Sequence, residues 1–149
     1  MATGYNGTNY AKSIDPSSAN IVDPGVLGGK VRVIQDTTIA QVLATGDYFL
    51  IGKKLPTGAQ VVDIIVAVTA LTGSGNFIEV GDEGDSDRYL TTSTTSAAKI
   101  YVGMNAVEGV NYPVTGTTDN IIRVTSGGTA GAAPLSGGVI KVTVFYTME

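Results

Sequence analysis

The sequence predicts an all-β protein, a single jelly-roll-like β-sandwich with an extended N-terminal arm. Roughly eight short runs alternate apolar with polar residues or are rich in β-branched and aromatic residues, as strands are. Gly, Thr, Ser and Pro turns separate these runs, which favours a sandwich, and a jelly roll over a barrel. Only residues 38–44, TIAQVLA, fit a helix, and they fit a strand equally well.

We divide the chain into an N-terminal arm, residues 1–29, and a β-sandwich domain, residues 30–149. The arm is polar and rich in turn residues, and it shows no apolar periodicity. It is either a disordered tail or an arm that becomes ordered against a partner. In the second case the candidate partner contacts are Tyr5, Tyr10, Ile14, Ile21 and Val22. The two tyrosines would combine contact area with a hydroxyl group.

The predicted strands follow from residue 30 onward. In chain order they are KVRVIQ, DYFLIG, the long run 60–71, NFIEV, AKIYVG, NIIRVT and GVIKVTVFY. The long run would be a central strand, covered on most of both faces, because its two faces are both largely apolar. One of its faces is predicted to carry Val62, Ile64, Val66 and Val68.

The last predicted strand has the clearest period of two. Its alternation places one set of side chains on the same face: Ile140, Val142, Val144 and Tyr146.

Composition excludes several function classes. The chain has 13 acidic and 9 basic residues, a net charge of −4, which gives no electrostatic reason to bind nucleic acid or anionic lipid. It has no histidine and no cysteine, so thiol catalysis, disulfides and imidazole or thiolate metal sites are excluded. We therefore expect no cofactor. The longest apolar run, 61–71, is too short to span a membrane, and the N-terminus lacks the apolar region of a signal peptide.

The stretch GDEGDSDRYL, residues 81–90, concentrates the acidic residues. Asp82, Asp85 and Asp87 are candidate calcium ligands, because calcium prefers carboxylate oxygens. The glycine and glutamate positions do not fit an EF-hand, which leaves only a looser calcium site. We favour a structured turn, since the preceding strand must end and Gly and Asp turn the chain in solvent. Asp87 beside Arg88 can also form a local ion pair, which contributes little if exposed.

The sequence does not predict an enzyme. The acidic residues sit together on one loop, and tryptophan, common in sugar-binding clefts, is absent. A Ser–His pair cannot form without histidine, and neither a G-x-S-x-G nor a phosphate-binding loop motif occurs.

Two motifs, in this order along the chain, resemble a group of small virion proteins of tailed bacteriophages. In the first, a Leu-Pro-x-Gly-Ala-x-Val turn leads into a long strand; here it is formed by Leu55, Pro56, Gly58, Ala59 and Val61. The second is a Val-Gly-Asp run ending in Asp-Arg-Tyr, formed by Val80, Gly81, Asp82, Asp87, Arg88 and Tyr89. The resemblance covers roughly residues 28–146, and the first 27 residues and the loop 97–118 match nothing in this group.

This resemblance implies a structural protein that decorates and stabilises the capsid by bridging major capsid subunits. It implies the major capsid protein as partner, a homo-oligomer with a trimer favoured, and a place on the capsid surface of the virion after synthesis in the host cytoplasm. Two alternatives remain open: a neck, tail or fibre component of the virion, and a β module that binds a glycan with the help of calcium at the acidic stretch.

Overall fold

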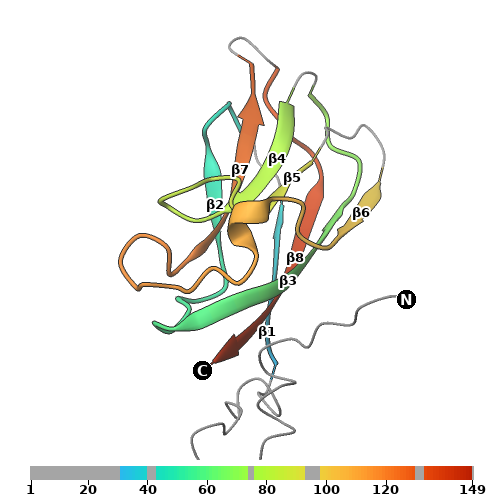
Figure 1. The fold of residues 1–149 in the computed structure, drawn as a ribbon. Coiled ribbons are helices and arrows are strands. Elements are labelled where there is room, and N and C mark those ends of the chain that lie inside the picture. The colour runs from blue at the N-terminus through green and yellow to red at the C-terminus, as the bar shows by residue number, and fades with distance from the viewer. Residues whose placement is uncertain (1–30, 40–42, 74–75, 93–97, 130–132, 149) are drawn as a thin grey trace, which may run out of the picture.

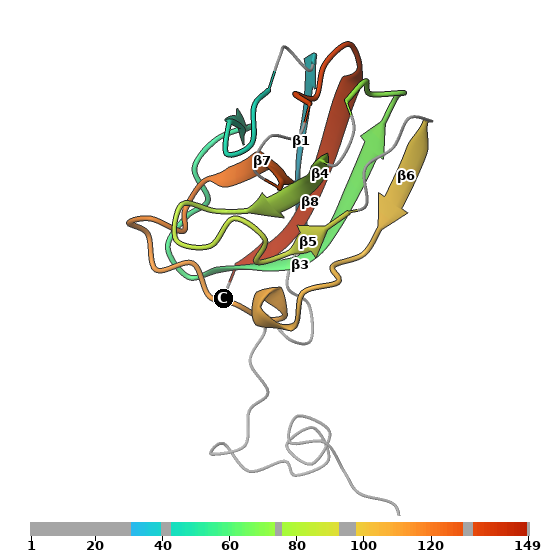
Figure 2. The same cartoon turned by 90° about the horizontal axis from the view of Figure 1, so that it is seen from above.

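The computed structural model describes residues 31–39, 43–73, 76–92, 98–129 and 133–148, so the predicted arm lies outside it. The described residues form two four-stranded antiparallel sheets that pack face to face (Figures 1 and 2). The strands are β1 (Arg32–Ile39), β2 (Tyr48–Ile51), β3 (Ala59–Val68), β4 (Asn76–Gly81), β5 (Leu90–Thr91), β6 (Lys99–Val102), β7 (Ile122–Gly128) and β8 (Val139–Met148). A 3-10 helix, η2 (Val107–Gly109), follows β6. The predicted all-β sandwich is confirmed.

The strand order is nested. One sheet has the order β1-β8-β3-β6, and the other has the order β2-β7-β4-β5. The first strand therefore pairs with the eighth, the second with the seventh, the third with the sixth and the fourth with the fifth, all antiparallel. We interpret this nesting as jelly-roll topology, in which one long antiparallel hairpin is wound into two sheets.

The two longest strands, β3 and β8, lie side by side in the middle of their sheet, as predicted for the long apolar run. Their register shifts between Val61 and Asp63, so the intervening Val62 is an extra residue in β3. Val61 is fully buried, whereas Val62 is 39% exposed. The prediction that Val62 shares a face with Ile64 is therefore wrong, because an extra residue reverses the alternation of a strand on either side of it.

The core lies between the two sheets. In β8 every second side chain faces it, and this confirms the predicted buried set of Ile140, Val142, Val144 and Tyr146. The opposing sheet contributes fully buried side chains from its own central strands, among them Val80, Ile122 and Val124. Beyond the bulge, β3 adds Ile64, Val66 and Val68.

The Leu-Pro-x-Gly-Ala-x-Val motif forms the turn that leads into β3. Leu55 and Ala59 are buried at its two ends, and Gly58 has a φ of +83°, which favours glycine. The Leu55 N–H donates to the carbonyl of Asn120, and the Gly58 N–H donates to the carbonyl of Val114. The motif thus docks the start of β3 on the loop that precedes β7.

The segment 38–44 is not helical where it is described. Strand β1 continues to Ile39, residues 40–42 lie outside the description, and Leu43 forms an isolated bridge with Leu135. Within the described ranges, no helix has the length and apolar character needed to cross a membrane.

The bulge in β3 predicts a large loss of stability at one of two adjacent valines and almost none at the other. Val61→Ala should destabilise the fold by roughly 1.5–3 kcal/mol, because it empties a buried position. Val62→Ala should change the unfolding free energy by no more than about 0.5 kcal/mol, because the side chain is largely outside the core. Urea unfolding of both variants and the parent measures the difference. Equal losses for the two variants would contradict the placement of the bulge.

Candidate functional site

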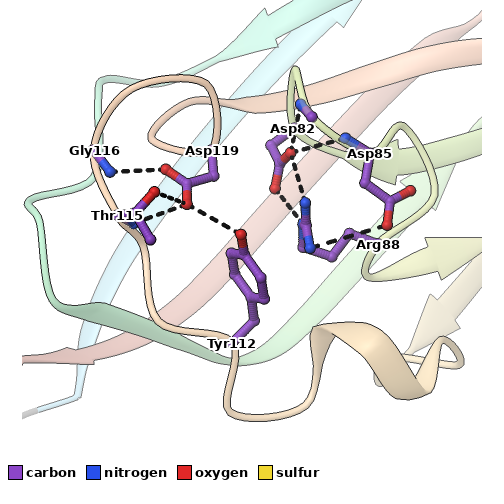
Figure 3. A network of polar contacts seen from close by, with 8 residues as sticks. Asp82, Asp85, Arg88, Tyr112, Thr115, Gly116 and Asp119 are labelled. Carbon is purple, nitrogen blue, oxygen red and sulfur yellow. Dashed lines mark hydrogen bonds and ion pairs between the residues drawn. The ribbon is translucent and has the colours of Figure 1, made fainter.

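The acidic stretch forms a closed turn directly after β4 (Figure 3). The Asp82 side chain is fully buried and accepts hydrogen bonds from the N–H groups of Gly84, at 2.9 Å, and Asp85, at 3.0 Å. The Asp82 N–H in turn donates to the carbonyl of Asp85, at 2.9 Å. This is the structured turn that we favoured from the sequence, built around one buried carboxylate.

Arg88 neutralises that carboxylate. Its Nε lies 2.5 Å from Asp82 Oδ2, and its guanidinium lies 3.8 Å from the centre of the Tyr112 ring. Burial acts to lower the pKa of Arg88, but the hydrogen bond and the negative charge of Asp82 outweigh it and raise the pKa. The expected local ion pair between Asp87 and Arg88 gives way to pairing with Asp82, six residues earlier.

The other two candidate calcium ligands lie on the solvent side of the turn. Asp85 Oδ2 is 4.0 Å from Arg88 Nη1, and Asp87 is exposed. Hydrogen bonding to Asp85 raises the pKa of Asp87. Across the described part of the chain, no three acidic side chains come together in a way that could hold a metal ion. The geometry therefore lends no support to calcium binding by Asp82, Asp85 and Asp87.

A second buried carboxylate, Asp119, organises the loop before β7. Its Oδ2 accepts hydrogen bonds from the N–H and hydroxyl of Thr115, at 2.8 and 2.7 Å, and its Oδ1 accepts one from the Gly116 N–H, at 2.8 Å. The Tyr112 hydroxyl also donates to Asp119 Oδ2, at 3.3 Å. These donors outweigh the effect of burial and lower the pKa of Asp119 to about 2.

The two loops form one polar network at this end of the sandwich. Tyr112 contacts both halves, with its ring against Arg88 and its hydroxyl on Asp119 (Figure 3). The Glu83 N–H donates to the carbonyl of Thr118, at 2.9 Å, and the Glu83 carboxylate pairs with Arg123 at 3.1 Å. Both buried carboxylates accept several internal hydrogen bonds, so the network holds the two loops in place. The same hydrogen bonds leave the carboxylates little capacity to bind an external ligand.

Sequence reasoning had picked out Arg88 and Tyr89 as motif residues and gave Asp119 no role. A local signal for Asp119 exists in the run TGTTD, residues 115–119, because Asp commonly accepts hydrogen bonds from backbone N–H groups of a neighbouring turn. The predicted partner contacts Tyr5, Tyr10, Ile14, Ile21 and Val22 lie outside the described residues.

Solved structures of phage capsids contain chains of the same fold. A chain in the capsid asymmetric unit of cyanophage Pam1 is 25% identical, has a TM-score of 0.60, and the match covers 82% of this chain and 87% of that one. A chain in the acid-stable capsid of Helicobacter pylori bacteriophage KHP30 is 16% identical, with a TM-score of 0.55 and coverage of 79% and 87%. One in the capsid of Ralstonia phage GP4 is 19% identical, with a TM-score of 0.53 and coverage of 81% and 84%.

No protein-family model and no curated protein sequence matches this chain. The class that the fold defines is a β-sandwich shared with chains of phage capsids, and the matches cover about four-fifths of this chain.

Removing the Asp119 carboxylate should destabilise the fold. Asp119→Ala leaves the N–H groups of Thr115 and Gly116 without their acceptor, and we expect a loss of roughly 1–3 kcal/mol. Urea unfolding at pH 7 measures it. Glu108→Ala, at an exposed position on η2, is the control and should stay within about 0.5 kcal/mol of the parent. A neutral Asp119→Ala would contradict a structural role for this carboxylate.

The low pKa of Asp119 also predicts a pH dependence. Its folded-state pKa of about 2 lies below the ordinary value of 3.8, so ionised Asp119 stabilises the fold above pH 3.8. That contribution is lost as the pH falls from 3.8 towards 2. Urea unfolding of the parent and of Asp119→Asn, which does not titrate, should show a stability difference that shrinks over this interval. A difference that stays constant would contradict the lowered pKa.

Proposed function

We propose that this protein is a non-enzymatic structural component of a phage virion that decorates and stabilises the capsid. The observation that carries the proposal is the 25% identical chain in the Pam1 capsid asymmetric unit, since that match covers more than four-fifths of each chain. The fold shared with the KHP30 and GP4 capsid chains agrees with it. The polar network supports a structural role, because its buried carboxylates are occupied by internal hydrogen bonds.

The proposed partner is the major capsid protein. A decoration protein joins neighbouring capsid subunits, and several weak contacts made by an oligomer add up to tight binding on a lattice. We propose a homo-oligomer, with a trimer favoured, located on the capsid surface. The contacts assigned to the capsid are the apolar side chains of the arm, residues 1–29: Tyr5, Tyr10, Ile14, Ile21 and Val22. Ordering the arm costs conformational entropy, so these contacts must exceed that cost.

Deleting residues 1–29 tests the role of the arm. The truncated protein should keep its urea unfolding midpoint, because residues 31–148 already contain both sheets and the hydrophobic core between them. It should lose binding to empty capsid shells in a co-sedimentation assay. A matched variant, Tyr5→Ala with Tyr10→Ala, should weaken binding through loss of two aromatic contacts. Full shell binding by the truncated protein would refute the role of the arm.

The number of copies per particle tests where in the virion the protein lies. Quantitative mass spectrometry of purified particles should find this chain at a simple ratio to the major capsid protein. Only a few copies per particle would indicate that the protein belongs to the neck, tail or fibre. Complete absence from particles would refute the virion role.

A further inference from the structure

The last residue of the Asp-Arg-Tyr motif, Tyr89, carries a buried hydroxyl group. Its side chain belongs to the hydrophobic core and has no exposed surface. A phenylalanine would fill the same apolar space, so packing alone does not account for the oxygen atom. Among the described residues, Tyr89 Oη has no hydrogen-bond partner. A buried hydroxyl without a partner is costly, because folding has removed it from water.

The fold holds Tyr89 in place, so the hydroxyl cannot easily move to a new partner. The Tyr89 N–H donates to the carbonyl of Val80, and the Tyr89 carbonyl accepts from the N–H of Asn105, both at 3.0 Å. Gly109 of η2 packs directly against the ring, since a Cβ atom at this glycine would lie only 2.7 Å from Tyr89 Cδ1. The hydroxyl therefore stays where the backbone and η2 position it.

Charged groups surround the hydroxyl. The charges that act most strongly on it are those of Asp82, Arg88 and Asp119, which belong to the polar network. Burial, followed by the negative charge of Asp82, raises the pKa of Tyr89. The hydroxyl therefore keeps its proton at neutral pH and is available as a donor. A donor thus lies close to two carboxylates, yet neither of them accepts a hydrogen bond from it.

Each of the two carboxylates has one oxygen that is only partly used (Figure 3). A carboxylate oxygen can accept two hydrogen bonds. Within the described structure, Asp82 Oδ2 accepts from Arg88 Nε, and Asp119 Oδ1 accepts from the Gly116 N–H. The other oxygen of each carboxylate already has at least two donors. One acceptor position therefore remains on Asp82 Oδ2 and one on Asp119 Oδ1.

Ser126 of β7 has a buried hydroxyl in different surroundings. It is 1% exposed, and its Oγ also has no hydrogen-bond partner among the described residues. Its neighbours on the core face are apolar: Ile78 lies opposite it on β4, and Val124 precedes it by two residues on β7. A buried water molecule needs two to four polar partners, and these neighbours do not provide them. The position of Tyr89 beside two carboxylates is therefore what distinguishes its hydroxyl.

We propose that one internal water molecule accepts a hydrogen bond from the Tyr89 hydroxyl and donates to Asp82 or Asp119. Water can accept from one group and donate to another, so it joins a hydroxyl to a carboxylate that is out of direct reach. Buried water molecules make about three hydrogen bonds, and one donor with two open acceptor positions supplies that number. The water would link Tyr89 to the loops after β4 and before β7. This inference goes beyond the proposed function and does not depend on it.

A high-resolution crystal structure of the full chain tests the proposal directly. An ordered water molecule should lie within about 3.2 Å of Tyr89 Oη and of a carboxylate oxygen of Asp82 or Asp119. A direct hydrogen bond from Tyr89 to either carboxylate would refute the proposal. A hydroxyl with no ordered water within that distance, or with one that reaches neither carboxylate, would also refute it.

Removing the hydroxyl tests whether the water stabilises the fold. Tyr89→Phe keeps the ring and loses only the hydrogen bond to the water, so the urea unfolding midpoint should fall. Ser126→Ala is the matched control, because it removes a buried hydroxyl among apolar neighbours, and its midpoint should stay the same or rise. A Tyr89→Phe midpoint equal to or above that of the parent would contradict the proposal, since this is the result expected for an unpaired hydroxyl.

The two measurements together distinguish a bridging water from direct contact. A lower midpoint for Tyr89→Phe with an ordered water at Oη supports the bridge. A lower midpoint with a direct hydrogen bond to Asp82 or Asp119 refutes it. Neither result bears on the virion role, which the shell-binding and copy-number measurements test separately.

Discussion

The pairing of β3 with β8 is the contact on which the rest of the sandwich depends. These are the two longest strands, and each is bordered by a second partner, β6 beside β3 and β1 beside β8. Their inner faces supply much of the core, from Val61 in β3 to Tyr146 in β8. About seventy residues, which include strands β4 to β7, separate the paired segments along the chain. Such long-range pairing brings a high cost of loop closure. A single bulge at Val62 lets β3 keep both Val61 and Ile64 in the core.

The polar network solves a different problem. The loops after β4 and before β7 close one end of the sandwich, and their backbone groups need partners where the sheets end. Asp82 and Asp119 provide those partners because one carboxylate can accept several N–H groups at once. Arg88 compensates the charge of Asp82, and Asp119 relies on backbone and hydroxyl donors. Neither arrangement resembles a catalytic pair, which fits a protein whose proposed work is done by its surfaces.

Sequence patterns predicted those parts of the fold that depend on local alternation. Strand β8 follows a strict period of two, so its buried face could be read directly. In β3 the same rule identified the strand and its central place but misassigned Val62, since an extra residue looks like any other valine until the partner strand is known. Turn composition and strand number favoured a jelly-roll-like sandwich. Which strand pairs with which is a long-range property that these local patterns do not contain.

Side-chain pairing was harder to predict than strands. Sequence adjacency favoured Asp87 as the partner of Arg88. In the structure the turn folds back on itself, and Arg88 donates instead to the buried carboxylate of Asp82. The acidic stretch shows that neighbouring carboxylates need not face one point: Asp82 points inward and pairs with Arg88, and Asp85 and Asp87 lie on the solvent side. Asp119 was missed because the only signal for it is its own turn-forming loop, residues 115–119, a pattern that also occurs in many turns without a buried carboxylate.

The distribution of chemistry over the molecule connects the fold to the proposed role. One end of the sandwich is fixed by buried charges that are satisfied internally. Exposed apolar side chains lie on both edges of the sheet β1-β8-β3-β6, among them Val33 on β1 and Ile100 on β6. This division suits the proposed role, since a protein that binds a capsid must hold its shape through its own contacts and keep apolar area on its surface for a partner.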